Sequence, residues 1–374
     1  MQNQAETTVD IQKIAEEIQK FNGFLKNSEH LKELRESARK KMSPTPREVL
    51  YREHSTTLYY YPPLAGYETR LSHPLLIIPS LVNKPCIMDL MKGESFIGAM
   101  LQGGSSVYML EWGEPTLAQS RYSLYKYLFS YIGRAVRRII THSGKDSLNL
   151  AGYCLGGALS VLYSALARSQ NINSLITMVT PVNFHDKGLL SFWAKEEHFN
   201  VDKLVDTWGN IPADFFASCF PWLVPTANLK KMRMIYDKHD NDEFMEAFFA
   251  LDIWLTENIP FPGEVYREII KQGYQQNSLA STGTWNFGNS VIANLNDICV
   301  PVLNLTATYD HVSPPESCSM LTGLLKNSHC QQRDYPIGHL GIALGKDAKN
   351  KPTKEYWNDI LTFLGDVDCW KKPQ

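Results

Sequence analysis

One sharp turn constrains the fold of this sequence more than any other feature. An apolar run at 148–151 leads through GYCLGG, residues 152–157, into a stretch of helical spacing that ends near Arg168. The residue at the apex of such a strand-to-helix turn has a strained backbone, and side chains two positions before and after it would collide with neighbouring backbone. Glycines occupy both of those positions, 152 and 156. We therefore predict that Cys154 is a nucleophile on a strand–turn–helix elbow, rather than a buried structural cysteine, and that the start of the following helix favours its thiolate form.

The regions around this turn alternate between short apolar runs and helical stretches. Such alternation is typical of a mostly parallel sheet whose strands are joined by crossover helices. The spacing also predicts one long helix over about 124–140 and another over 156–168. The predicted strands are Thr57–Tyr61, Leu75–Ile78, Ser106–Leu110, Leu148–Ala151, Leu175–Thr180 and Val302–Thr306, with a last strand just before His339.

The amino-terminal region has a different pattern. From about residue 9 to residue 40, apolar residues recur at helical spacing among Lys, Glu and Gln, and Pro44 and Pro46 then end the helix. We predict an amphipathic helical arm and linker over 1–46. Its apolar stripe fits either packing on its own domain or binding to a partner.

A third pattern covers residues 186–290, where aromatic residues and prolines gather and no clean strand pattern is seen. About 100 residues is too long for a loop, so we predict a helical cap subdomain over the carboxyl edge of the sheet. Residues 47–185 and 291–374 would then form the core. The aromatic side chains fit either the core of a small subdomain or an apolar wall beside a substrate.

A cysteine nucleophile on such a sheet needs a base and an acid later in the chain, in the order nucleophile, acid, histidine. Asp310 follows the apolar run 302–306, and His339 lies between glycines after the last predicted strand. We predict that these two complete a triad with Cys154. His311 is a weaker choice because neighbouring side chains at a strand end point in opposite directions. Asp334 is an alternative orienting acid, although its place on the last strand suits a surface pair.

Acyl chemistry also requires donors for an oxyanion. The amide of Leu155, directly after the nucleophile, is the first candidate, and Val82 or its neighbour Leu81 supplies the second from the loop after 75–78.

Composition excludes several other kinds of protein. The net charge of −2 gives no field for nucleic acid or an anionic membrane, and the seven cysteines contain no C-x-x-C pair. The histidines show no metal-ligand spacing, so we expect neither a metal nor a cofactor. We find no signal peptide pattern and no long apolar segment, from which we expect a cytoplasmic protein without direct membrane insertion.

Several separate motifs together resemble the polyhydroxyalkanoate synthase family, specifically the short catalytic subunit of its two-component members. The resemblance spans roughly residues 44–370. It rests on TPREVLYREHSTTLYYY, PLLIIPSLVNKPCIMDL, VYMLEWGEP, GYCLGG, MVTPVNF, TYDHVSPP and GHLG, in that order.

The resemblance implies an α/β-hydrolase fold and a role for each candidate residue. Cys154 would carry the growing acyl chain, His339 would activate it, and Asp310 would support the histidine or the attacking 3-hydroxyl. The substrate would be a 3-hydroxyacyl-coenzyme A such as the precursor of poly(3-hydroxybutyrate), and the product a polyester chain. The resemblance also implies a second synthase subunit, a homodimer or hetero-oligomer, and a place at the surface of a polyester granule.

We therefore expect an α/β-hydrolase core with a cap and a cysteine acyltransferase that polymerises 3-hydroxyacyl-coenzyme A. Two alternatives remain. A thioesterase, depolymerase or other hydrolase would share the triad but give the acyl group to water. A non-catalytic granule scaffold would be expected to lose at least one triad residue, and all three are present here.

Overall fold

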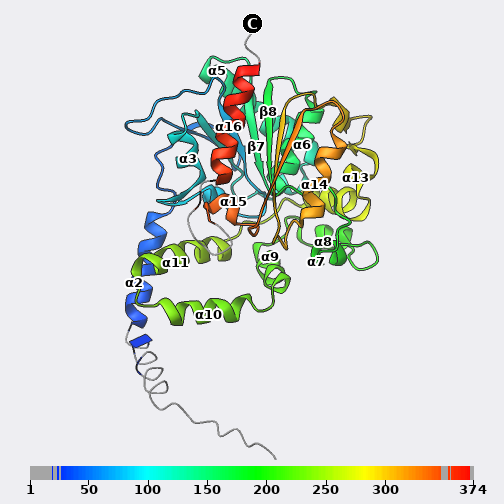
Figure 1. The fold of residues 1–374 in the computed structure, drawn as a ribbon. Coiled ribbons are helices and arrows are strands. Elements are labelled where there is room, and N and C mark those ends of the chain that lie inside the picture. The colour runs from blue at the N-terminus through cyan, green and yellow to red at the C-terminus, as the bar shows by residue number, and fades with distance from the viewer. Residues whose placement is uncertain (1–18, 20–22, 25–26, 347–352, 354, 371–374) are drawn as a thin grey trace, which may run out of the picture.

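The central element of the fold is an eight-stranded sheet (Figure 1), seen in a computed structural model that describes residues 19, 23–24, 27–346, 353 and 355–370. The strands lie in the order β1-β2-β6-β3-β7-β8-β11-β12. Neighbouring strands from β6 to β12 in this order run parallel to one another. Strand β2 runs antiparallel to both of its neighbours, β1 and β6. Their bounds are β1 Glu48–Glu53, β2 Thr56–Tyr61, β3 Leu75–Ile78, β6 Val107–Glu111, β7 Leu148–Tyr153, β8 Ile172–Met178, β11 Val302–Ala307 and β12 Cys330–Tyr335.

This sheet confirms the predicted fold class. Each predicted strand overlaps an observed one. The sequence pattern missed β1, which pairs with β2 at the sheet edge, because none of its residues is buried and charged residues flank its three apolar ones.

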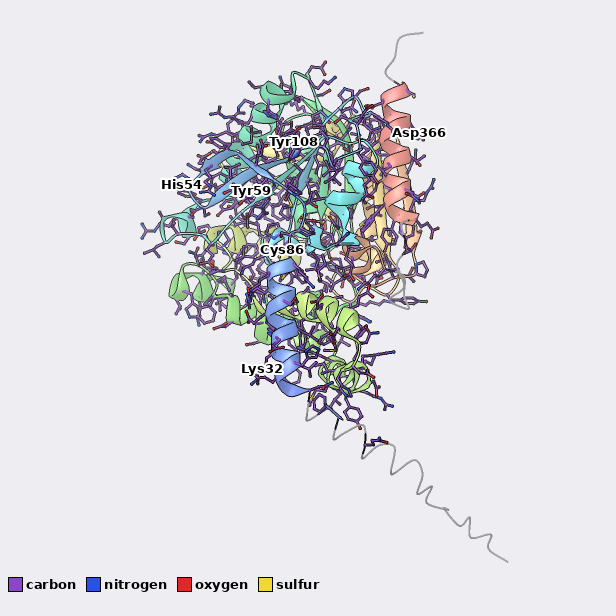
Figure 2. The ribbon with its side chains drawn as sticks, turned by 90° about the vertical axis from the view of Figure 1, so that its left-hand side faces the viewer. Lys32, His54, Tyr59, Cys86, Tyr108 and Asp366 are labelled. Atoms are coloured by element: carbon purple, nitrogen blue, oxygen red, sulfur yellow. The ribbon has the colours of Figure 1, made fainter. Side chains whose placement is uncertain are left out.

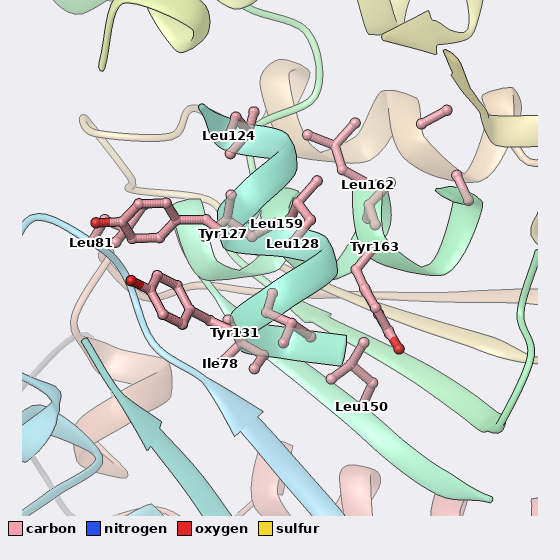
Figure 3. Packing of buried hydrophobic residues seen from close by; sticks show 14 of the residues in the cluster. Ile78, Leu81, Leu124, Tyr127, Leu128, Tyr131, Leu150, Leu159, Leu162 and Tyr163 are labelled. Atoms are coloured by element: carbon pink, nitrogen blue, oxygen red, sulfur yellow. The ribbon is translucent and has the colours of Figure 1, made fainter. Parts of the chain in front are cut away.

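Hydrophobic layers cover both faces of the sheet because successive side chains of a strand point to opposite sides. Within β3, Leu76 and Ile78 face one layer, and Leu75 and Ile77 face the other. The first layer contains α5 (Gly133–Ser143), α6 (Leu155–Leu166) and α14 (Pro315–Leu324). Figure 3 shows part of it, with Leu159 and Leu162 of α6 lying among Tyr127, Leu128 and Tyr131. The second layer contains α3 (Phe96–Gln102), α15 (Gly341–Leu344) and α16 (Glu355–Trp370).

The long helix predicted over 124–140 is not a regular α-helix, and this corrects the prediction. It consists of α4 (Leu124–Lys126), a π-helical segment η3 (Tyr127–Ile132) and α5. Tyr127, Leu128, Tyr131 and Ile132 are all buried in that segment. Hydrophobic spacing alone does not distinguish a π turn from an α turn over so few residues.

The stretch between β8 and β11 is largely helical, and Figure 1 shows α7 to α11 below the sheet and α13 beside it. It contains α7 (Leu189–Trp193), α8 (Val201–Trp208), α9 (Ala213–Cys219), η4 (Phe220–Leu223), α10 (Ala227–Lys238), α11 (Asp242–Thr256), α12 (Gly263–Glu268), the π-helical η5 (Ile269–Gln275) and α13 (Ser278–Thr282). A small hairpin of β9 (Thr284–Asn286) and β10 (Ile292–Asn294) follows. The sequence pattern predicted no strand there, because three residues are too few to show alternation. The remaining short elements are η1 (Pro85–Met88), β4 (Asp89–Met91), β5 (Glu94–Ser95), η2 (Ala118–Arg121) and η6 (Leu295–Asp297).

The described part of the amino-terminal arm is α2 (Ser28–Lys41), which packs along α11. Figure 2 shows this helix, marked by Lys32, running away from the sheet. Leu31, Leu34 and Ala38 form its buried stripe. Arg35 of α2 and Lys231 of α10 both pair with Asp252 of α11. Of the two interpretations left open by the sequence, the structure shows the arm packed on its own chain over these residues; the predicted part at 9–27 lies largely outside the described residues.

Candidate active site

The turn at Cys154 has the strained geometry that the glycine pattern predicts. Cys154 lies between β7 and α6 with φ 55° and ψ −126°, values that L-residues rarely adopt. A Cβ atom on Gly152 would lie 2.4 Å from the Cα of Gly157, and one on Gly156 would lie 2.2 Å from the carbonyl oxygen of Ile78. Neither position can therefore hold a side chain while the backbone keeps this turn.

The turn places the Cys154 thiol at the start of a helix. Its backbone amide donates to the carbonyl of Met178 (2.8 Å), so the end of β8 holds the apex in place. The thiol is partly exposed, whereas Cys318 is fully buried. A thiolate at the amino end of α6 interacts favourably with the helix dipole.

Asp310 and His339 lie together although 29 residues separate them. The Nδ1 atom of His339 is 2.7 Å from Oδ2 of Asp310. The other oxygen of Asp310 accepts the backbone amides of Val312 (2.8 Å) and Ser313 (2.9 Å). This carboxylate is buried and held from both sides, so it fixes the orientation of the imidazole.

Electrostatic interactions link the histidine to the cysteine. Burial by itself would lower the pKa of His339, but the charges of Asp310 and Cys154, and hydrogen bonds to both, raise that pKa well above its ordinary value. The Asp310 carboxylate and the Cys154 sulfur therefore favour the imidazolium form of His339. The arrangement can take a proton from the thiol and return it to a leaving group.

The two alternative residues, Asp334 and His311, lie in different surroundings. Asp334 is exposed on β12 and accepts hydrogen bonds from the side chains of Thr306 (2.5 Å) and Gln332 (2.9 Å). His311 is exposed and lines the cavity described below, whereas the sequence pattern suggested that it packs away from the site. The turn after β11 that aims the Asp310 carboxylate at His339 leaves the next side chain at the surface.

The two candidate oxyanion donors have different surroundings. The Leu155 amide is the first of α6, among the amides that a helix leaves without an intrahelical partner. The Val82 amide donates to the hydroxyl of Ser80 over 3.3 Å, a long contact. Val82 lines the cavity and is partly exposed, while Leu81 is buried in the core. These positions favour Val82 over Leu81, and its role stays a prediction.

A cavity of about 1610 Å³ reaches Cys154 and His339. Its walls come from both the sheet edge and the helical insertion, and they are mainly apolar. Aromatic residues of the insertion both line this cavity and pack on one another: Phe216 lines it and also packs on Phe261 and Tyr266. Other apolar residues in the walls are Phe184, Trp193, Phe215, Phe248, Leu251 and Tyr274.

Two tyrosines at the site were not singled out by the sequence pattern. Tyr153 precedes the nucleophile, and its hydroxyl donates to the carbonyl of His339 (3.1 Å). Tyr274 lies on the π-helical η5, and burial and the nearby charge of Cys154 raise the pKa of its phenol. A tyrosine in an apolar stretch has no distinctive spacing, so only the tertiary structure reveals their position.

Over the part of the chain that the structure describes, no cluster of His, Cys, Asp and Glu is suited to hold a metal ion. Within the same residues, no helix combines the length and apolar character needed to cross a membrane.

Comparison with known proteins gives two family matches. Residues 103–345 match the alpha/beta hydrolase fold, and residues 4–100 match the amino terminus of the poly-beta-hydroxybutyrate polymerase PhaC. Among curated proteins, the poly(3-hydroxyalkanoate) polymerase subunit PhaC of Allochromatium vinosum is 35% identical over 83% of this chain and 86% of its own length. The protein of the same name from Haloferax mediterranei is 32% identical over 80% of this chain, but the match spans only 60% of that longer protein.

Solved structures add support for the fold alone. A hydrolase from Pseudomonas aeruginosa PA01 superimposes with a TM-score of 0.50 at 15% identity, covering 85% of this chain and 98% of that one. At this level of identity the similarity does not extend to substrate or reaction.

Proposed function

The chain belongs to the family of poly(3-hydroxyalkanoate) polymerases, and we propose that it polymerises 3-hydroxyacyl-coenzyme A through a covalent acyl-cysteine intermediate on Cys154. The observation that carries this proposal is the strained elbow that holds Cys154 beside the hydrogen-bonded His339–Asp310 pair at one apolar cavity. Asp310 and His339 complete the proposed triad. The amides of Leu155 and Val82 are the proposed oxyanion donors.

The first step is transfer of the acyl group to the enzyme. His339 accepts the thiol proton, and the Cys154 sulfur attacks the thioester carbonyl of the substrate. The bond between the carbonyl carbon and the coenzyme A sulfur then breaks, and coenzyme A leaves with the proton from His339. One thioester replaces another, so the acyl group remains activated.

The second step joins two acyl units. The 3-hydroxyl oxygen of one unit attacks the acyl-cysteine carbonyl of the other, forming an ester and releasing the Cys154 sulfur. His339 relays the hydroxyl proton to that sulfur. Asp310 stabilises the imidazolium during both transfers, and its buried position suits this role.

The apolar walls of the cavity support polymerisation over hydrolysis. Water that reached the acyl-cysteine would release a free hydroxy acid and end the chain. Cap side chains such as Phe248 and Leu251 line the cavity and disfavour ordered water beside the thioester.

We further propose that the chain works with a second synthase subunit at the surface of a polyester granule. The relatives from Allochromatium and Haloferax are each named as a subunit, which supports a partner for this chain. The division into an arm at 1–46, a core at 47–185 and 291–374 and a cap at 186–290 is part of the same proposal.

The test follows coenzyme A release from 3-hydroxybutyryl-coenzyme A, with and without a co-expressed neighbouring subunit. The acyl product is characterised for the unaltered chain and for Cys154→Ala. We expect polymer from the unaltered chain and none from the variant, and an acyl adduct on Cys154 by mass spectrometry. Cys299→Ala is the matched control, because Cys299 is an exposed free thiol that does not line the cavity.

Two results would contradict the proposal. Free 3-hydroxybutyrate without polymer under both conditions would leave a cysteine thioesterase on the same fold. Polymer formation by Cys154→Ala would exclude the acyl-cysteine route.

A further inference from the structure

The side chain of Tyr153 connects the proposed nucleophile, Cys154, to the proposed base, His339. Tyr153 is the last residue of β7 and directly precedes Cys154. Its hydroxyl donates to the backbone carbonyl of His339 over 3.1 Å, across 186 residues of sequence. The segment that carries His339 (residues 336–346, called the histidine loop below) is therefore attached to the residue before the nucleophile.

The ring of Tyr153 makes a second contact with the same residue. Its centroid lies 5.4 Å from the centroid of the His339 imidazole, at an interplanar angle of 51°. Tyr153 is 2% exposed. One buried side chain thus contacts both the backbone and the ring of the histidine, which leaves the imidazole little freedom to tilt away from Cys154.

The electrostatic surroundings keep this hydroxyl a donor. Burial, followed by the charges of Cys154 and Asp310, raises the pKa of Tyr153 well above its ordinary value. The phenol is therefore neutral wherever the enzyme works, and its proton stays available for the carbonyl of His339.

The histidine loop also has attachments that do not involve the nucleophile. On α16, the hydroxyl of Tyr356 lies within hydrogen-bond distance of the carbonyl oxygens of Gly341 (2.8 Å) and Lys346 (2.9 Å), and its one proton is donated to either of them. The indole of Trp357 donates to the carbonyl of Ile342 (2.8 Å). These bonds hold the loop to the core just after His339, but none of them involves the turn that carries Cys154.

We propose that Tyr153 is a positioning residue, whose hydroxyl sets the distance and angle between the His339 imidazole and the Cys154 thiol. The inference rests on the proposed function, in which His339 moves a proton to and from that thiol. Proton transfer depends steeply on donor–acceptor geometry, so the hydroxyl acts on the rate of the chemical steps and not on substrate binding.

Tyr153→Phe tests the proposal because it removes one oxygen atom and keeps the ring. Tyr356→Phe is the matched control, since it makes the same chemical change and also frees carbonyls of the histidine loop. We expect Tyr153→Phe to lower kcat for coenzyme A release about three- to tenfold, the equivalent of one hydrogen bond, and to leave KM unchanged. Tyr356→Phe should affect thermal stability more than kcat.

A second measurement does not depend on the acyl substrate. The rate of Cys154 alkylation by iodoacetamide is followed against pH, with peptide mass spectrometry to separate Cys154 from the exposed Cys299 and Cys369. The imidazole of His339 interacts electrostatically with Asp310 and Cys154 and contacts the ring of Tyr153, and its protonated form attracts a negative charge on the sulfur. Weaker alignment in Tyr153→Phe should therefore move the half-maximal rate to higher pH, and Tyr356→Phe should leave it in place.

The outcomes separate the two proposals. An unchanged kcat and an unchanged alkylation profile in folded Tyr153→Phe overturn the positioning role. Equal shifts in both tyrosine variants also overturn it, because they would indicate general loosening of the loop. If the unaltered chain makes no polymer but its alkylation profile still shifts in Tyr153→Phe, the proposed function fails and the positioning role stands.

Should Tyr153→Phe fold poorly, Tyr153→Trp keeps a buried aromatic donor, and recovery of the alkylation profile by it supports the role.

Discussion

At the scale of single residues, the site depends on two positions beside Cys154 that carry no side chain. Gly152 and Gly156 leave room for the turn that lifts Cys154 from the sheet, and any side chain there would contact backbone. Because backbone atoms cannot rotate away from an added Cβ atom as a side chain can, the turn itself would have to distort.

Gly156→Ala should destabilise the fold by about 1–3 kcal/mol or more, because its Cβ would lie 2.5 Å from the carbonyl oxygen of Pro79 as well as against Ile78. Gly323→Ala is the control: Gly323 lies in α14 with no atom within 4 Å of the added Cβ, and alanine there should stabilise the fold by about 0.5–1 kcal/mol. Urea denaturation measures both. Equal effects at the two positions would show that the turn relaxes without cost.

Asp310→Asn should lower kcat by about 10²- to 10⁴-fold while keeping the side-chain shape. The variant removes the charge that raises the pKa of His339, so that pKa should fall and the imidazolium should be less populated at neutral pH. The rate of coenzyme A release against pH is the measurement. Asp334→Asn serves as the control, because Asp334 bonds to Thr306 and Gln332 and not to His339. A larger loss of kcat in Asp334→Asn than in Asp310→Asn would show that Asp334, and not Asp310, orients His339.

At the scale of elements, α12 of the insertion is attached to the core by a partly buried polar contact as well as by apolar packing. Glu268 of α12 accepts the backbone amide of Leu124 over 2.9 Å, at the start of α4. Burial raises the pKa of Glu268 to about 7, and the nearby Glu264 adds to this effect. The contact therefore joins α12 to the π-containing helix that follows Leu124.

Glu268→Gln should stabilise the fold at high pH. The unfolded carboxyl titrates at about 4.3 and the folded one at about 7, so the folded chain holds a proton between these values. The stability that this proton provides is complete below about pH 4.3 and is lost as the pH rises through about 7, a difference of up to roughly 4 kcal/mol. Glutamine still accepts the Leu124 amide and does not ionise. The free energy of unfolding of Glu268→Gln, measured by urea denaturation, should exceed that of the unaltered chain by little at about pH 5 and by the full amount at about pH 8. A difference that does not depend on pH would contradict the raised pKa of Glu268.

At the scale of the whole molecule, the cavity belongs to no single element. Cys154 comes from the elbow, His339 from the loop after β12, and the apolar walls largely from the helices between β8 and β11. The arm α2 supports one wall, because it packs on α11, whose residues Phe248 and Leu251 line the cavity.

Leu251→Ser should shift the products from polymer toward free hydroxy acid, because a hydroxyl in the wall can hold water near the acyl-cysteine. The ratio of 3-hydroxybutyrate to polymer at equal substrate consumption measures this. Leu229→Ser on α10 is the control, since Leu229 is 71% exposed and does not line the cavity. An unchanged ratio in folded Leu251→Ser would show that this wall does not control access of water.

The sequence by itself determined the fold class and the candidate residues Cys154, Asp310 and His339, because these follow from local signals. Glycine spacing marks a turn that only glycine allows, and an acid and a histidine after consecutive strands of a parallel sheet must meet at one edge. The tertiary structure alone decided how these residues are held. The two amides on Asp310, the Tyr153 hydroxyl on His339 and the walls of the cavity are contacts between segments far apart in the chain. Such contacts leave no periodicity in the sequence, and the π turns and three-residue strands are too short to show one.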